Sequence, residues 1–296
     1  MKSINPKDIS TGELHGYLLG AIAPRPIAFA STIDKEGNVN LSPFSFFNVF
    51  GSNPPVLIFS PARRVRDNTT KHSLENVKEV KEVVINMVNY SMVEQMSLAS
   101  TEYDKGVNEF VKAGLTEVGS TLVKPPRVAE SPVAFECKVL QILPVGEEGG
   151  AANLIICEVV MVHVKEDVLD HDGKISPFKL DSVARMGGDW YCRANGNALF
   201  EIPKPIRNKG IGVDTIPTEI RNSAVLTGNN LGRLGNVEKL PSGDDIEAYS
   251  HNPVIQEYKV RFQNDPESYI FHLHEFAKEK LESGNIEEAW KILLQK

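Results

Sequence analysis

The segment formed by residues 60–73 has the residue types of an anion-binding site. It reads SPARRVRDNTTKHS, so three arginines follow a predicted strand, and hydroxyl, amide and lysine side chains precede a predicted helix. Unpaired N–H groups at a helix N-terminus bind anions, and neighbouring cations add charge-assisted hydrogen bonds. The same residues would also suit a solvent-exposed basic loop with ordinary helix capping. The segment alone therefore leaves phosphate binding and a plain loop open.

A second segment, residues 24–48, combines strand-forming and hydrogen-bonding residues. The runs PRPIAFAST and NLSPFSFFN lie on either side of the turn sequence DKEGN. Apolar runs separated by such a turn predict a β-hairpin. Its strand ends carry hydroxyl, amide and phenylalanine side chains, which together suit a planar ligand with polar edges. Phenylalanines at strand ends also commonly belong to the core, so this interpretation stays open as well.

Few other residues form a pattern with a specific chemistry. His163 lies in an apolar run, where a hydrogen-bonded barrel histidine is the simpler interpretation and a place near a redox cofactor is the alternative. His171 stands between two aspartates before a glycine, which is typical of a turn. The sequence has no Gly-x-Gly-x-x-Gly motif after a strand, no P-loop and no spacing that specifies a catalytic triad. We expect no metal site.

The first 200 residues are rich in predicted strands. These strands cover residues 26–32, 39–44, 55–60, 82–89, 133–143 and 154–164. Helices are predicted at residues 70–79 and 91–99, the second with a capping box formed by Ser91 and Glu94, and a helical turn at residues 108–113. Strands and helices do not alternate regularly. We therefore predict a mainly β fold, an antiparallel, Greek-key-like barrel that is closed or partly closed, with helical insertions.

The composition changes near residue 200. Residues 201–212 are rich in Pro, Lys, Asn and Gly, and residues 212–235 predict a loop with two short helices. From residue 244 the apolar spacing becomes helical, with one helix beginning at Pro266 and ending before Gly284, and a last helix over residues 285–294. We expect a barrel domain at residues 1–200, a connector or tail at 201–243 and a helical extension at 244–296.

Charge and cysteine content limit the possible partners. The chain of 296 residues has 32 basic and 39 acidic residues, giving a net charge of -7 and a pI near 5.6. Such a chain is a poor general binder of nucleic acid or anionic membrane. The N-terminal residues lack the apolar stretch of a signal peptide, and three scattered cysteines form no Cys-x-x-Cys motif. We expect a cytoplasmic protein with reduced thiols.

Residues 10–200 resemble the flavin reductase-like, FMN-binding split-barrel family. The matching motifs, in chain order, are PRP at 24–26 with Ser31-Thr32, NLSPFSFFN at 40–48, NPP at 53–55, EVVIN at 82–86, PRVAESP at 126–132, FEC at 135–137 and RMGG at 185–188. The resemblance implies a non-covalently bound FMN at the interface of a homodimer of split barrels. It gives no explanation for the last 95 or so residues.

The resemblance also implies which residues contact the flavin. Arg25, Ser31 and Thr32 would lie along it, and Ser42, Pro43, Phe44 and Ser45 would border its ring. The segment from Ser60 onward would take the phosphate, with Lys71 as its main cation and Arg66, Asn68, Thr69 and Thr70 as neighbours. Many family members have Lys-Asp-Thr where this chain has Lys71-His72-Ser73, so Ser73 is a weaker candidate than Lys71.

In the family the cofactor supplies the chemistry. The flavin accepts hydride from a nicotinamide, and the protein supplies position and electrostatics. The resemblance implies an NAD(P)H-dependent flavin oxidoreductase that passes electrons to free flavin or a partner protein, with His163 as the candidate close to the nicotinamide or flavin. A flavoredoxin-like electron carrier reduced by a partner protein is the first alternative. The second is a non-catalytic FMN-binding or scaffold protein whose helical extension recruits a partner.

Overall fold

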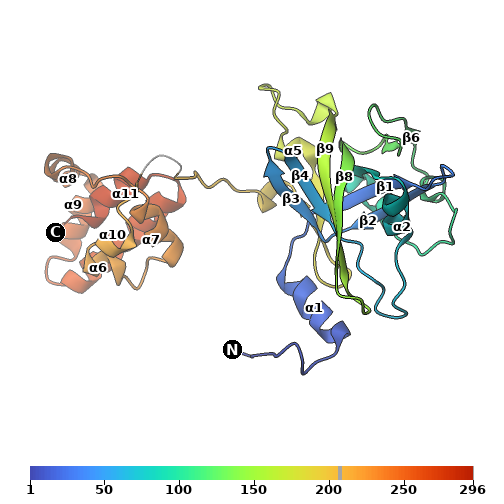
Figure 1. Cartoon of the computed structure of the whole chain (residues 1–296). Coiled ribbons are helices and arrows are strands. Elements are labelled where there is room, and N and C mark those ends of the chain that lie inside the picture. Colours follow the sequence, from blue (N-terminus) through green and yellow to red (C-terminus); the bar gives the residue numbers. More distant parts are fainter. Residues whose placement is uncertain (206–208, 296) are drawn as a thin grey trace. The chain divides into compact units, whose positions relative to one another are not determined.

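The chain consists of two compact units. The computed structural model describes residues 1–205 and 209–295. Contacts divide the chain into Met1–Phe200 and Glu201–Lys296, a strand-rich unit and a helical unit (Figure 1).

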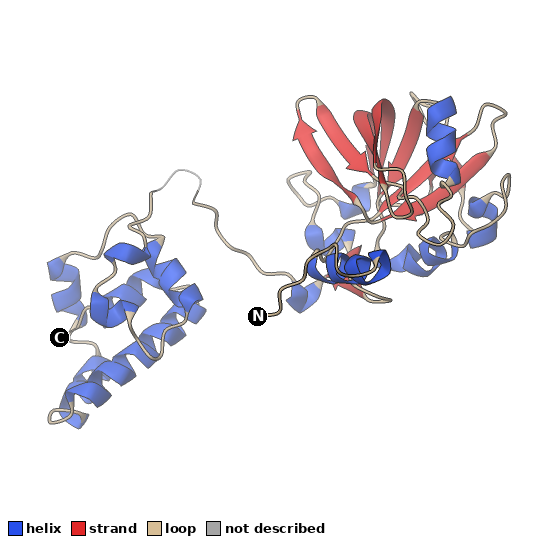
Figure 2. Cartoon of the chain, turned by 60° about the horizontal axis from the view of Figure 1, so that its bottom comes forward, coloured by secondary structure: helices blue, strands red, loops and turns tan. Residues whose placement is uncertain are grey.

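A seven-stranded antiparallel sheet forms the centre of the first unit, in the order β2-β1-β5-β8-β9-β4-β3 (Figure 2). Its strands are β1 (Ala28–Ile33), β2 (Val39–Phe44), β3 (Phe47–Ser52), β4 (Pro55–Phe59), β5 (Glu82–Asn86), β8 (Val133–Val145) and β9 (Ala152–Val164). Two short ribbons pair β6 (Glu117–Val118) with β7 (Arg127–Val128), and β10 (Ser182–Arg185) with β11 (Tyr191–Ala194). The edge strands β2 and β3 do not pair with each other within the described residues, so the barrel is split. The predicted fold class is confirmed.

The predicted hairpin of β1 and β2 is present, and β8 and β9 form a second, longer hairpin. β1 pairs with β2 so that Ser31 lies opposite Leu41, and the carboxylate of Asp34 in the turn accepts hydrogen bonds from the backbone and the side chain of Asn38. Gly37 has a φ of 88°, which a residue with a side chain rarely adopts. β8 and β9, each 13 residues long, pair along their whole length.

The sheet buries a different apolar core on each face. Successive side chains of a strand point to opposite faces. Ala28 and Ala30 of β1 join one core, which the helix α2 (His72–Glu79) covers with Leu74 and Val77. Phe29, between them in sequence, joins the other core, which contains residues of α3 (Val93–Leu98) and α4 (Glu109–Ala113).

The helical predictions for the first unit were correct in part. α4 is capped by Asn108, whose side chain accepts from the Phe110 N–H, and it ends at Gly114. The predicted Ser91 capping box is wrong: the Ser91 hydroxyl donates to the Asn89 side chain, and α3 begins after a 3-10 turn without a side-chain cap. The helix α1 (Thr11–Ala21), the short helix α5 (Pro177–Leu180) and strand β3 were not predicted.

The second unit has its own helical core. Its helices are α6 (Thr218–Arg221), α7 (Gly228–Gly235), α8 (Gly243–Tyr249), α9 (Pro253–Arg261), α10 (Pro266–Glu282) and α11 (Ile286–Leu293). Trp290 is 1% exposed at the centre of this core and donates a hydrogen bond to the carbonyl of Leu234.

The helical unit starts earlier than the predicted boundary at residue 244. Ile220 of α6 and Leu234 of α7 belong to the same core as residues of α10 and α11, so the expected connector at 201–243 is largely part of the helical unit. The few apolar residues of this segment that pack into the helical core stand among glycines and asparagines, so their spacing does not predict a packed helical unit. Residues 206–208 of the expected connector lie outside the described residues.

No membrane-spanning helix and no metal-ligating cluster is found among the described residues. None of the helices within residues 1–205 and 209–295 has both the length and the apolar character needed to cross a membrane. The same residues contain no group of three or more metal-ligating side chains. Cys137 and Cys157 are buried, and burial raises the pKa of the Cys157 thiol to about 12, so this thiol is uncharged at neutral pH.

Candidate functional site

A pocket of about 240 Å³ brings together six of the predicted flavin-contacting residues. These are Ser42, Pro43, Phe44, Ser45, Ser60 and Lys71. The first four come from the end of β2 and the following turn, Ser60 follows β4, and Lys71 directly precedes α2. Segments that are separate in sequence therefore meet because β2 leads into β3, and β3 pairs with β4.

The pocket has further walls, of which the two residues that come from α1 were not predicted. These walls are formed by His15, Leu19, Phe46, Ala62 and Ser100. His15 and Leu19 come from α1, and the His15 ring meets the Phe46 ring edge-on with 6.2 Å between centroids. A sequence signal for α1 exists, because Ser10 and Glu13 form a capping box at its start. That signal predicts a helix, although not its position at the pocket.

Arg25 fixes the end of α1 beside the pocket. It is 5% exposed, and its guanidinium donates to the carbonyls of Leu19, Ile22 and Met186, with the Nη1–O distance to Leu19 being 2.6 Å. Its Nε lies 3.5 Å from the Ser45 hydroxyl. Arg25 does not itself line the pocket, so its role in this structure is to position α1 and Ser45.

The Arg-Met-Gly-Gly motif of residues 185–188 packs against the same helix end. Arg25 and Arg185 exchange two backbone hydrogen bonds of 2.9 Å. A Cβ atom on Gly187 would lie 3.1 Å from the Cα of Gly20, which is closer than almost all real contacts. The motif therefore allows the chain to approach the backbone of α1.

Ser31 and Thr32 are fully buried and do not line the pocket. They point to opposite faces of β1. The Thr32 hydroxyl accepts a hydrogen bond of 3.2 Å from Asn76 of α2. The Ser31 hydroxyl, on the face that carries Phe29, has no hydrogen-bond partner among the described residues. The structure does not bring these two residues together with the six above.

Substituting Ser31→Ala tests whether this hydroxyl contacts a ligand. A buried unpaired hydroxyl costs free energy, so we expect the variant to be equal in stability to the natural protein or up to about 1 kcal/mol more stable. Thr32→Val, which removes the bond from Asn76, should instead lose about 1 kcal/mol. Urea unfolding measures both changes. A Ser31→Ala protein with weakened flavin binding and lower stability would contradict the placement.

Three cations gather around one carboxylate next to the pocket. Arg64 Nε lies 2.8 Å from Glu102 Oε1, Lys71 Nζ lies 3.6 Å from the same oxygen, and Arg66 Nη2 lies 3.1 Å from Oε2. Arg66 also pairs with Asp67 at 3.0 Å. Burial, and then the charge of Arg64, lower the pKa of Lys71. Positive charge is therefore concentrated at the Lys71 end of the pocket.

The other predicted phosphate neighbours stabilise the loop that carries these cations. The Asn68 backbone has a φ of 57°, and its side-chain oxygen accepts a hydrogen bond from Arg63. The Thr69 hydroxyl donates to Asp67 at 2.6 Å and accepts from Arg64 at 2.8 Å, and Arg64 also donates to the Thr70 carbonyl. The side chain of Asn68 and the hydroxyl of Thr69 are thus used within the loop, and neither lines the pocket.

The glycine-rich turn between β8 and β9 supports the same loop. Arg63 and Gly150 are joined by a backbone bond of 3.0 Å, and the Asn68 side chain donates to the Glu147 carbonyl. A Cβ on Gly149 would lie 3.0 Å from the Val65 carbonyl oxygen. Glycine is therefore required for the turn to lie this close to the basic loop.

The N-terminus of α2 supports anion binding at the Lys71 end. Lys71 occupies the N-cap position and makes no side-chain capping bond. Hydrogen-bond donors at the start of a helix favour an anion. Ser73 is buried and its hydroxyl lies 3.4 Å from the Asn40 amide nitrogen, so it does not line the pocket, whereas Lys71 does.

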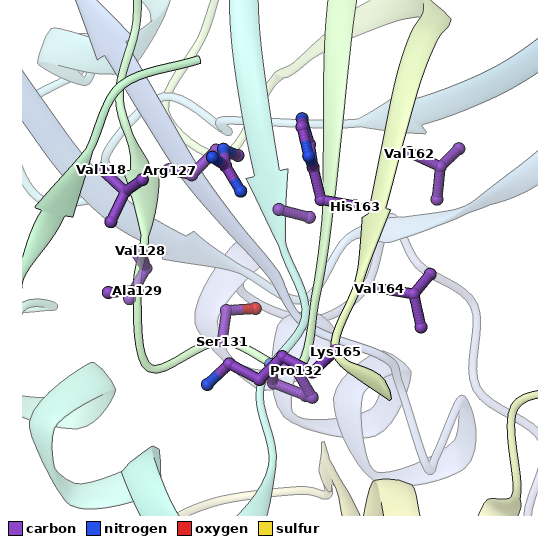
Figure 3. A pocket seen from close by; sticks show the side chains of 11 residues that line it. Val118, Arg127, Val128, Ala129, Ser131, Pro132, Val162, His163, Val164 and Lys165 are labelled. Carbon is purple, nitrogen blue, oxygen red and sulfur yellow. The ribbon is translucent and has the colours of Figure 1, made fainter. Parts of the chain in front are cut away.

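His163 lies in a different, open pocket of about 450 Å³ on β8, β9 and β7 (Figure 3). This pocket shares no lining residue with the pocket at Lys71. His163 Nε2 lies 2.6 Å from Glu136 Oε1, and the Glu136 side chain is fully buried. Burial alone would raise the pKa of Glu136, but hydrogen bonds from the backbone of Thr121 and Leu122 and the contact with His163 outweigh it and lower the pKa. His163 is thus a hydrogen-bonded strand histidine.

Comparison with known protein families gives one match. The family described as "Flavin reductase like domain" matches residues 20–179, all within the first unit. Among curated proteins, one from Aquifex aeolicus is 39% identical over 196 residues, covering 66% of this chain and 97% of that protein. One from Halalkalibacterium halodurans is 40% identical over 208 residues, covering 70% and 99%.

Solved structures agree with this match. Nitrilotriacetate monooxygenase component B from Bacillus cereus has a TM-score of 0.64 and 30% identity, covering 68% of this chain and 98% of its own. A protein with a split barrel domain from Shewanella frigidimarina has a TM-score of 0.58 and 27% identity, covering 69% of this chain and 100% of its own. The fold, the order of the motifs and these similarities together show that the chain belongs to the flavin reductase-like family of split-barrel flavoproteins.

Proposed function

We propose that the first unit binds FMN non-covalently in the pocket at Lys71 and acts as an NAD(P)H-dependent flavin oxidoreductase. The observation that carries the proposal is that one pocket combines an aromatic, hydroxyl-bearing surface with a cluster of cations. Hydroxyl and aromatic groups of Ser45 and Phe46 lie in the same pocket as Lys71, beside which Arg64 and Arg66 gather. A ring system with a phosphorylated tail needs both.

The residues present fit FMN by their donor chemistry. Lys71 and Arg64 offer charge-assisted hydrogen bonds to a phosphate, and the uncapped start of α2 lies at the same place. The hydroxyls of Ser42 and Ser45 offer hydrogen bonds to polar ring edges. Phe46 is 40% exposed and offers an aromatic surface.

A bound flavin would supply the redox chemistry, because it accepts hydride from a nicotinamide and releases electrons to an acceptor. The protein's own residues bind and orient. Arg25 holds α1 so that His15 and Leu19 form one wall of the pocket. The hydroxyls of Ser42 and Ser45 would orient the flavin ring by hydrogen bonds to its polar edge. His163 lies outside this pocket, so the proposal gives it a structural role with Glu136 rather than a catalytic one.

The proposed assembly is a homodimer in which a second copy covers the pocket. β3 is an edge strand, and its Val49 and Phe50 are both 63% exposed. Exposed apolar side chains on an unpaired edge favour contact with another chain. A redox partner protein and a cytoplasmic location complete the proposal, the latter from the cysteine content and charge of the sequence.

The visible spectrum of the purified protein, loaded with FMN, tests the proposal. We expect the absorption of oxidised flavin at about 450 nm, and we expect it to bleach when NADH or NADPH is added without oxygen. Absorption that persists with both nicotinamides but bleaches with dithionite would favour an electron carrier reduced by another protein. A bound FMN that dithionite cannot reduce would favour a non-catalytic scaffold, and a protein that binds no FMN would overturn the proposal.

A further inference from the structure

Glu102 occupies the centre of the cation cluster beside the pocket. Both of its carboxylate oxygens are used, one by Arg64 and Lys71 and the other by Arg66. Arg64 and Lys71 are the donors that the proposed function assigns to the flavin phosphate. Hydrogen bonds from Arg64, and then from Arg66, lower the pKa of Glu102 to about 2, so its carboxylate is charged throughout the neutral range.

The Glu102 side chain reaches the cluster from the pocket wall. Ser100, two residues earlier, lines the pocket, and Glu102 itself lies outside helices and strands. The side chain is 43% exposed, and the hydrogen bonds and ion pairs of its carboxylate in the described residues are all to these three cations. Asp67 differs, because it also accepts from the backbone and the hydroxyl of Thr69 and thereby shapes the loop.

A carboxylate and a phosphate accept hydrogen bonds from guanidinium and ammonium groups in the same way. The two anions cannot use the same Arg64 and Lys71 donors at once. Within the described residues, no other hydrogen bond ties the Glu102 carboxylate to the fold, and the side chain is partly exposed to solvent, so displacement from the cations breaks only these contacts.

We propose that Glu102 is an internal counter-anion that competes with the flavin phosphate for Arg64 and Lys71 and is displaced when FMN binds. This inference rests on the proposed function. Glu102 thus lowers the affinity of the site for FMN and for other phosphorylated ligands, but not for a flavin without a phosphate. Its single negative charge also reduces the mutual repulsion of the three neighbouring cations.

Substituting Glu102→Gln tests the competition, since it keeps the shape of the side chain and removes its charge. We expect the dissociation constant for FMN to fall roughly three- to tenfold, because exposed ion pairs are weak individually. The dissociation constant for riboflavin, which lacks the phosphate, should not change. Titrations of the full chain, followed by quenching of flavin fluorescence, measure both constants.

Glu36→Gln is the matched control. Glu36 is exposed in the turn between β1 and β2 and forms no ion pair with these cations, yet its substitution changes the net charge equally. We expect the control to leave both constants unchanged.

Two results would overturn the inference, and they are distinguishable from failure of the proposed function. If Glu102→Gln weakens FMN binding or leaves it unchanged while the natural protein binds FMN, Glu102 positions the cations or plays no part. An equal gain with Glu36→Gln or with riboflavin would show a general charge effect. If the natural protein binds neither flavin, the proposed function itself fails, and this inference fails with it.

Discussion

Arg25→Ala is expected to lower the free energy of unfolding of the first unit by about 2–4 kcal/mol. The guanidinium is 5% exposed and donates to the carbonyls of Leu19, Ile22 and Met186, which join the end of α1 to the segment after β10. Removing it leaves these carbonyls without their donor. Because a buried unpaired polar group costs about 1–3 kcal/mol, several of them together account for the expected loss.

The measurement is urea unfolding of the full chain, followed by hydrogen exchange in peptides from residues 1–200. Arg25→Lys is the control, since a single ammonium keeps the charge but cannot reach three carbonyls in a fork geometry. We expect an intermediate loss for this variant. Flavin binding should weaken in both, because His15 and Leu19 lose their fixed position at the pocket. A loss below about 1 kcal/mol for Arg25→Ala would contradict the anchoring role.

Lys71→Ala is expected to raise the dissociation constant for FMN by about 10- to 100-fold, or roughly 1.5–3 kcal/mol. Lys71 lines the pocket at the start of α2. Burial lowers the pKa of its ammonium group, which lies 3.6 Å from Glu102. A charge-assisted bond to phosphate is the interaction that the substitution removes. Riboflavin binding should change little, and fluorescence titrations with the two flavins separate these effects.

Lys78→Ala provides the control for Lys71→Ala. Lys78 lies in α2, the helix that Lys71 precedes, and pairs with Glu75 at 3.2 Å, but it does not line the pocket. We expect no change in FMN binding for this variant. An unchanged FMN affinity in Lys71→Ala, or an equal loss for FMN and riboflavin, would show that the phosphate lies elsewhere.

Local patterns in the sequence were sufficient to predict the β1–β2 hairpin. The apolar runs on either side of the turn sequence DKEGN predict the β1–β2 pairing that the structure shows. The family resemblance proposes Ser42 to Ser45 as flavin contacts, and the structure places them at the end of β2 and in the turn after it, where they line the pocket. The failure at Ser91 has a local cause as well: its hydroxyl bonds to Asn89 instead of capping a helix.

The helical unit shows a different limit of the sequence. The prediction of a connector or tail at residues 201–243 rests on the Pro, Lys, Asn and Gly content of residues 201–212 and on the glycines and asparagines that recur up to residue 236. Burial of Ile220 and Leu234 with Trp290 outweighs this low helix propensity. Propensity is a local quantity, whereas burial depends on partners more than 50 residues away.

The sequence by itself determined the split-barrel fold of the first unit and its family, and it proposed the segments that bind a flavin. Only the tertiary structure decided which side chains in those segments meet. It showed that His15 and Leu19 line the pocket, that the Ser31 side chain points into a core, and that Glu102 pairs with the cations of the basic loop. The physical reason is that strand and turn patterns are encoded by neighbouring residues, whereas contacts such as Arg64 with Glu102 join positions 38 apart and depend on how the whole chain packs.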